Sequence, residues 1–261
     1  MAIELSGYKM AESLRLDGRT AIYRAIRERD KKRVVIKALT AANPSEAEIA
    51  RFKQECKITQ NIDFPSAVKC YSLELHDRSL ALVLEDILGK SLQEVAQDTQ
   101  LALKDLLRIT IAIVETLAEL HKIPIIHKDI KPSNIIVNLD TGQVQIIDFG
   151  IASNLSVESP KLCDPSEIEG TIAYMSPEQT GRTSRLIDYR TDYYSLGVTC
   201  YELLTGSLPF VSENEMEVIH SHLADAPIVP HQLQPEIPEV VSSIVMKLLE
   251  KNAEDRYQTA I

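Results

Sequence analysis

The chain has 261 residues, of which 44% are hydrophobic, so it can bury a sizeable core in one large domain or two smaller ones. Its formal net charge of −10 argues against a general nucleic-acid-binding surface, because neutralising phosphates requires clustered Lys and Arg. Four scattered cysteines indicate reduced thiols, and because the sequence has neither a signal-peptide pattern nor an apolar run of membrane-spanning length, we expect a cytoplasmic protein without a membrane segment.

The first third of the chain predicts a sheet with one main helix. Residues 8–39 contain three strand-like runs, of which the alternating segment 21–26 and the β-branched segment 33–37 are the clearest. Ser45, followed by two glutamates within three residues, predicts a helix start, and the helix continues through Ile58. Two further strands are expected around 68–73 and 80–84.

The remainder predicts mainly helices. One apolar stripe at helical spacing indicates a helix that packs on a core, and it consists of Leu106, Ile109, Ile113, Leu117 and Leu120. Two apolar runs, 135–137 and 144–147, flank a turn at 140–142 and predict a small hairpin. A further helix is expected from about residue 189, ended by Gly206 and Pro209.

One segment carries the chemistry. Residues 127–134 read His-Lys-Asp-Ile-Lys-Pro-Ser-Asn, and Asp-Phe-Gly follows at 148–150. Phosphoryl transfer needs a carboxylate that accepts the proton of the attacking hydroxyl, and oxygen ligands that hold Mg²⁺ on the nucleotide phosphates. Asp129 is placed for the first task, and Asn134 and Asp148 for the second. Either motif alone can occur by chance, but the two in this order predict a phosphotransferase site.

These motifs resemble the catalytic loop and the metal-binding motif of the eukaryotic-type protein kinases, with Lys128 where Arg is usual. The Lys-Pro pair after Asp129 is similar to the serine/threonine branch, and it implies that Lys131 lies against the transferred phosphate. The resemblance covers residues 8–261 and implies an α+β, two-lobed fold. We expect a β-rich N-lobe with one main helix over about 8–86, a hinge at about 85–90, and a larger helical C-lobe over about 91–261.

The same resemblance implies an ATP site. Lys37 would hold the α- and β-phosphates, Glu55 on the helix would pair with Lys37, and Leu84 would be the gatekeeper. The other residues implied to contact ATP are Leu14, Gly18, Ile22, Val35, Glu85, Ile87, Ile136 and Ile147. The phosphate-covering loop departs from the family, because Arg15, Asp17 and Thr20 stand where glycines are usual and Gly18 is out of register.

Other positions are implied to be architectural. His127 would pack inside, Asp192 would cap the backbone of the catalytic loop, and Glu178 would form a buried ion pair with Arg256.

Thr171 would contribute to catalysis by bonding Asp129 and Lys131. The segment 148–178 is similar to an activation loop, whose candidate phosphorylation sites are Ser153, Ser156, Ser159 and Ser166.

The expected activity is therefore ATP- and Mg²⁺-dependent phosphorylation of serine or threonine in a protein substrate. The amino-acid sequence of residues 170–190 and 251–257 resembles that of the N-terminal kinase domain of bacterial, cyanobacterial-type hybrid proteins. Those proteins continue into ATPase, GAF and histidine kinase regions. We therefore expect further regulatory domains C-terminal to this chain. The alternatives are a pseudokinase-like interaction domain, favoured by the glycine-poor loop, and a small-molecule phosphotransferase.

Overall fold

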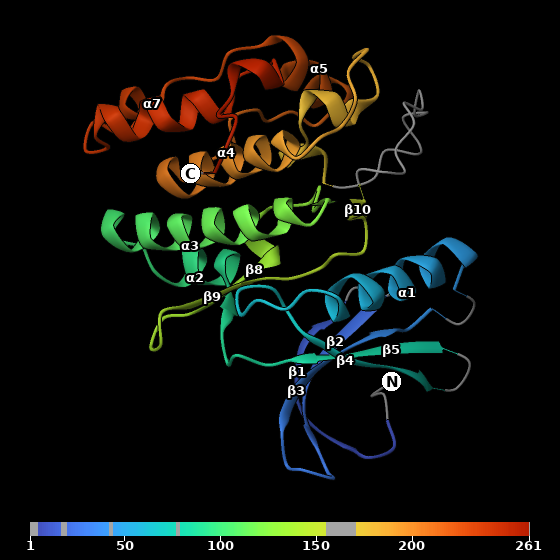
Figure 1. Ribbon diagram of the computed structural model, residues 1–261. Coiled ribbons are helices and arrows are strands. Elements are labelled where there is room, and N and C mark those ends of the chain that lie inside the picture. Colours follow the sequence, from blue (N-terminus) through green and yellow to red (C-terminus); the bar gives the residue numbers. More distant parts are fainter. Residues whose placement is uncertain (1–4, 17–19, 42–43, 77–78, 155–170, 261) are drawn as a thin grey trace. The chain divides into compact units, whose positions relative to one another are not determined.

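The computed structural model describes residues 5–16, 20–41, 44–76, 79–154 and 171–260. The chain divides into two compact units, the first formed by Met1–Gly89 with Asn138–Gly150 and the second by Lys90–Val137 with Ile151–Ile261. The first unit is β-rich with one helix, and the second is mainly helical (Figure 1). The expected α+β class is therefore confirmed. Within the described residues, no helix is both long enough and apolar enough to pass through a bilayer.

The first unit is built on a five-stranded antiparallel sheet in the order β1-β2-β3-β5-β4. The strands are β1 (Tyr8–Leu16), β2 (Thr20–Arg27), β3 (Arg33–Leu39), β4 (Cys70–His76) and β5 (Ser79–Glu85). Burial alternates strictly along β2, so one face of the sheet is core and the other carries the remaining side chains. The core face includes Ala21, Tyr23, Ala25, Val34, Ile36, Ala81 and Val83.

The helix of this unit, α1 (Glu46–Gln60), begins where the sequence predicts. Ser45 is its N-cap, and a reciprocal pair of hydrogen bonds with Glu48 forms a capping box. Phe52 and Cys56 are buried, and α1 packs on β4 and β5. This packing fixes the helix face that carries Glu55.

The hairpin segment 138–150 groups with the first unit, although the sequence places it within the C-lobe. Strand β9 (Gln143–Ile146) accounts for this grouping. The N–H of Val68 donates to the carbonyl of Ile146 at 3.0 Å, and the N–H of Ile146 donates to the carbonyl of Ser66 at 3.0 Å. The Gln145 amide also donates to Glu85 Oε2 at 3.0 Å. Asp148 therefore follows directly after a strand that is bonded to this unit.

The second unit contains the helices α2 (Leu92–Asp98), α3 (Leu103–Lys122), α4 (Arg190–Thr205), α5 (Glu215–Ala224), α6 (Pro230–Leu233) and α7 (Glu239–Leu248). Its short strands are β6 (Lys90–Ser91), β7 (Ile125–Ile126), β8 (Ile135–Asn138) and β10 (Ser153–Asn154). β6 pairs with β8, and β7 pairs with β10. Single 3₁₀ turns occur at Pro132–Asn134, Ile172–Tyr174, Pro177–Thr180 and Ala253–Asp255.

Helix α4 lies at the centre of this unit. Every residue from Thr191 to Tyr201 is buried, and α4 packs on both α3 and α7 (Figure 1). A Cβ atom at Gly197 would come within 2.8 Å of Leu248 Cβ, so only glycine allows α7 to approach this closely. Gly206 ends α4 in the left-handed conformation, as the sequence predicts. The predicted apolar stripe of α3 is buried throughout.

Candidate active site

Several predicted ATP-contacting residues share one face of the five-stranded sheet. Ile22 on β2 pairs with Lys37 on β3, and Val35 pairs with Leu84 on β5. Because side chains alternate along a strand, these four residues point to the same side, opposite the core face. Leu14 lies on β1 and is 37% exposed. Gly18 and Asp17, the predicted loop positions, lie outside the described residues.

Lys37 forms an ion cluster with two carboxylates of the same unit. Its Nζ atom lies 2.8 Å from Glu55 Oε2 and 2.8 Å from Asp148 Oδ1. This confirms the predicted pairing of Lys37 with Glu55. A Cβ atom at Gly150 would lie 3.3 Å from Asp148 Oδ1, so a glycine here gives the carboxylate room. Phe149, between them, is fully buried.

Burial and charge act against each other in this cluster. Burial lowers the pKa of Lys37, but the charges of Glu55 and Asp148 outweigh it and raise that pKa above its ordinary value, so the ammonium stays charged. Burial raises the pKa of Glu55 to about 7, although Lys37 opposes the shift. Lys37 is therefore a fixed positive charge that carboxylates orient.

The end of β5 and the segment after it are held by hydrogen bonds within their own unit. The N–H of Glu85 donates to the carbonyl of Lys69 at 2.9 Å, and Asn138 Nδ2 donates to the carbonyl of Ile87 at 2.8 Å. Ile147, after β9, belongs to the same unit, whereas Ile136, on β8, belongs to the second. Both isoleucines are half-buried.

The second unit brings together the residues predicted to be catalytic. Lys131 Nζ lies 2.6 Å from Asp129 Oδ2, and Asn134 Nδ2 donates to the same oxygen at 2.8 Å. Lys131 also donates to Thr171 Oγ1. In the described part of the chain, Thr171 reaches Asp129 only through this lysine, and Asp129 Oδ1 is buried without a hydrogen-bond partner. One carboxylate oxygen is therefore held by two donors, whereas the other has none within the described residues.

Asp192 holds the backbone on which these residues lie, as predicted. Its Oδ2 accepts the N–H of His127 at 3.0 Å, and its Oδ1 accepts the N–H of Lys128 at 2.8 Å. Burial raises the pKa of Asp192, but the hydrogen bonds and charges of His121, 3.0 Å away, and of His127 together outweigh it, so the net pKa is lowered. His127 is fully buried and its Nδ1 accepts the N–H of Asp129, which confirms its predicted packing.

The predicted ion pair of Glu178 and Arg256 is present and buried. The two guanidinium nitrogens lie 2.6 and 2.8 Å from the two carboxylate oxygens. Thr191 Oγ1 donates to Glu178 Oε1 at 2.8 Å, which links the pair to α4. Ser153 lies on β10, while the other candidate phosphorylation sites, Ser156, Ser159 and Ser166, lie outside the described residues.

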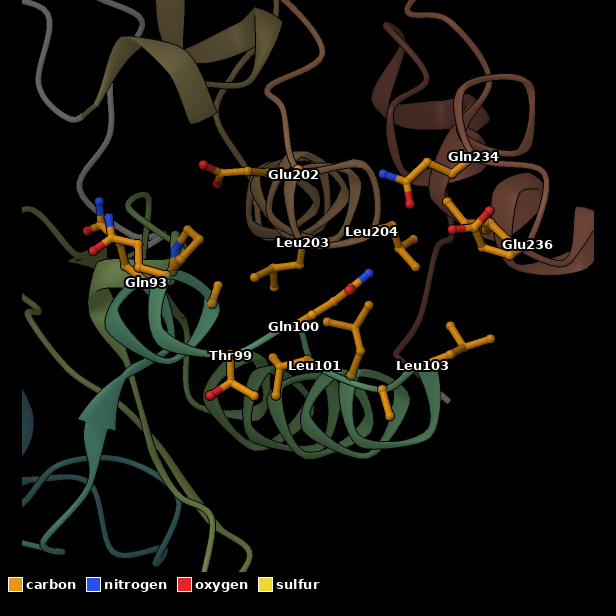
Figure 2. A pocket seen from close by; sticks show the side chains of 17 residues that line it. Gln93, Thr99, Gln100, Leu101, Leu103, Glu202, Leu203, Leu204, Gln234 and Glu236 are labelled. Carbon is orange, nitrogen blue, oxygen red and sulfur yellow. The ribbon is translucent and has the colours of Figure 1, made fainter.

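A cavity of about 620 Å³ lies elsewhere in the second unit. Figure 2 shows side chains from α2, from the start of α3 and from the end of α4 around it, with Gln93, Leu103 and Glu202 among them. Its lining contains none of the predicted ATP-contacting residues, and Pro132 is the lining residue that comes from the segment 127–134.

Residues 18–260 match the protein kinase domain family. The chain belongs to this family. It is 32% identical over 255 residues to a probable serine/threonine-protein kinase of Clostridium perfringens, covering 97% of this chain and 36% of that protein. It is 33% identical over 261 residues to the serine/threonine-protein kinase PknB of Mycobacterium leprae, covering 97% of this chain and 41% of that protein.

A third relative is the serine/threonine-protein kinase PrkC of Bacillus subtilis, 33% identical over 213 residues, with 81% of this chain and 32% of that protein covered. The kinase domain described here therefore spans less than half the length of these relatives.

Two positions of the site had no sequence signal. His121 lies just beyond the apolar stripe, while Asn138 occupies a position where any polar residue satisfies the local pattern.

Proposed function

We propose that this chain transfers the γ-phosphate of ATP to serine or threonine hydroxyls of a protein substrate. The observation that carries the proposal is the state of Asp129. Lys131 and Asn134 hold its Oδ2, and Oδ1 has no hydrogen-bond partner in the described part of the chain. A substrate hydroxyl that donates to Oδ1 is oriented for attack on the γ-phosphorus, and Asp129 receives its proton as ADP leaves.

Lys131 and Thr171 set the charge and position of this group. The ammonium of Lys131 touches Asp129 and Thr171, so it offsets charge on the transferred phosphate without moving far. A threonine at this point is consistent with a hydroxyl substrate of the serine/threonine type. Asp192 holds the backbone of His127 and Lys128, which keeps the neighbouring Asp129 in place.

The donor set suits Mg²⁺. Asn134 uses its amide nitrogen to bond Asp129, so its oxygen is the end suited to a hard cation, and the Asp148 side chain is 40% exposed. We propose both as metal ligands. Mg²⁺, when bound with ATP, would neutralise charge on the phosphates, and Lys37 would hold the α- and β-phosphates while Glu55 orients it.

Two backbone groups are candidates for the adenine edge. The N–H of Glu85 and the carbonyl of Ile87 are already bonded within the first unit, so we propose the carbonyl of Glu85 and the N–H of Ile87 as the adenine partners. Leu14, Ile22, Val35, Leu84, Ile136 and Ile147 are proposed as the apolar surroundings, and Gly18 as part of the phosphate-covering loop.

On sequence resemblance we further propose that residues 1–261 form one kinase domain of a cytoplasmic, bacterial hybrid signalling protein with regulatory domains C-terminal to it. The greater length of the relatives is compatible with additional domains. The alternative function is a pseudokinase-like interaction domain. The glycine-poor loop favours that alternative, because Arg15, Asp17 and Thr20 stand where glycines are usual in the family.

The test is to follow nucleotide binding and phosphate transfer in one preparation. Labelled ATP is supplied with Mg²⁺ or with EDTA, and phosphate is followed in the chain itself and in a generic basic protein substrate. We expect Mg²⁺-dependent incorporation at serine or threonine. Nucleotide binding without any transfer, in this chain and in a longer one, would contradict the proposal and support the interaction-domain alternative.

A further inference from the structure

The turn that follows β5 contains a strained residue. Leu88 has φ +56°, in the left-handed region that non-glycine residues rarely adopt. Its N–H donates to Asp86 Oδ1 at 2.7 Å. Such a conformation persists where neighbouring groups over-determine it. The surrounding contacts of the segment 86–89 therefore decide whether this turn keeps its shape.

Arg24, on β2, supplies those contacts. Its Nη2 donates to the carbonyl of Gly89 at 2.5 Å, and its Nε lies 3.3 Å from Asp86 Oδ2. The Asp86 side chain is only 4% exposed, so its carboxylate is buried against the guanidinium. The remaining nitrogen, Nη1, donates to Glu12 Oε2 at 3.0 Å, where Glu12 is 57% exposed. The guanidinium of Arg24 thus contacts both ends of the turn, Asp86 and Gly89.

Arg24 also lies in the row of residues predicted to face ATP. It pairs with Val35 on β3, and Val35 pairs with Leu84 on β5, so all three share one face of the sheet. Strand alternation requires only a polar or half-buried side chain at this position. A planar guanidinium that lies against the buried Asp86 carboxylate and also donates to the Gly89 carbonyl is a more specific feature than the pattern demands.

We propose that Arg24 is a positioning residue for nucleotide binding. It holds Asp86 and Gly89 at fixed places, and so fixes the backbone N–H of Ile87, whose carbonyl is held separately by Asn138. This inference rests on the proposed function, since it assumes that Ile87 receives the adenine edge. The gain is pre-organisation, because an ordered turn loses less freedom when the nucleotide binds.

The matched variants come from the two sides of the guanidinium. Arg24→Met removes both contacts of the guanidinium with the turn, Asp86→Asn removes the buried charge that Arg24 faces, and the double variant tests whether the two residues act as one unit. Glu12→Gln removes only the exposed partner of Arg24 and serves as the control. Arg24→Lys keeps the charge but not the planar fork. Dissociation constants for ATP and adenosine, kcat and KM for ATP, and amide hydrogen exchange at Leu88 are measured for each.

We expect Arg24→Met and Asp86→Asn to raise the dissociation constant and KM for ATP about tenfold. We expect kcat to stay within about twofold, since these residues touch no reacting atom. The double variant should be no worse than either single one, Arg24→Lys should be intermediate, and Glu12→Gln should match the wild type. The affinity for adenosine should fall by the same factor as the affinity for ATP, because the substitutions affect only the contact with the adenine base.

Unchanged nucleotide affinity in Arg24→Met and Asp86→Asn would overturn the inference, even if hydrogen exchange at Leu88 became faster. If Arg24→Met does not fold, Asp86→Asn and Arg24→Lys decide the matter by the same criteria. A wild-type chain that binds nucleotide but transfers no phosphate leaves the binding test intact while contradicting the proposed function. A wild-type chain that binds neither ATP nor adenosine overturns both.

Discussion

Lys37 Nζ, on β3, lies 2.8 Å from Glu55 Oε2, on α1 of the same unit. The same ammonium also lies 2.8 Å from Asp148 Oδ1, so one cation is held by a helix and by the segment after β9. Glu55 is almost fully buried, which makes the pair sensitive to loss of either partner. The position of Lys37 is therefore determined by two separate elements.

Replacing Lys37 with Met should lower phosphate transfer by about 100-fold or more, because the charge that offsets the ATP phosphates is lost. The matched control is Lys90→Met, which removes an exposed lysine that pairs with Asp98 at 2.7 Å. Steady-state assays of both variants check the prediction. Equal activities of the two variants would show that Lys37 has no special role.

Asp192→Asn should lower kcat by about 10- to 100-fold while the chain stays folded. The substitution replaces one of the two carboxylate oxygens that accept the N–H groups of His127 and Lys128, so Asp129 is held less firmly. Asp188→Asn is the control, because Asp188 bonds Arg190 rather than the catalytic loop. Circular dichroism and kcat are measured together, and a folded Asp192→Asn variant with wild-type kcat would contradict the assigned role.

Arg256→Met should cost about 3–5 kcal/mol of unfolding free energy, since Glu178 would be left buried without its partner. Arg185→Met tests the same change at an exposed pair, where Arg185 lies 3.3 Å from Glu254. That control should lose less than about 1 kcal/mol. Urea denaturation measures both, and similar losses would show that burial of the pair is unimportant.

His222 predicts a pH dependence of stability. It is fully buried, with Tyr194 Oη 2.9 Å from Nδ1, and burial together with the charge of Lys251 lowers its pKa to about 4. The unfolded chain, with an ordinary His pKa of 6.5, binds more protons below that pH. The contribution that neutral His222 makes to the free energy of unfolding is therefore fully present above pH 6.5 and is lost as the pH falls toward 4.

When the pH is lowered from 7.5 to 5, His222 alone should lower the free energy of unfolding by about 2 kcal/mol. Urea denaturation of the wild type and of His222→Gln at both pH values isolates its share, because other titrating groups remain in the variant. The wild type should lose more stability than the variant by that amount. Parallel losses in the two proteins would rule out His222 as the source.

Much of the site followed from sequence because its residues lie at fixed offsets in local patterns. Asp129 and Asn134 lie five residues apart in one short loop, and Glu55 follows Phe52 on α1 at the offset that the family resemblance implies. The pairing of Glu178 with Arg256 spans 78 residues and was reached by family resemblance rather than by any local signal.

The remaining contacts depend on tertiary structure. Arg24 lies against Asp86 only because the register of β2, β3 and β5 places them together. The left-handed conformation of Leu88 could not be predicted, because that conformation is usually indicated by glycine and this residue is leucine. His121 reaches Asp192 across 71 residues, and the burial of His222 depends on Phe210 and Tyr194. The bond expected between Thr171 and Asp129 passes through Lys131, because that ammonium lies against both.

The central claim is that Asp129 receives the proton of the attacking hydroxyl, and the most direct measurement is phosphate transfer by Asp129→Asn. Asp140→Asn, in the exposed turn between β8 and β9, is the matched control. The account predicts that Asp129→Asn keeps nucleotide binding but loses transfer by about 100-fold or more, whereas Asp140→Asn behaves as the wild type. Full turnover by Asp129→Asn would contradict the account.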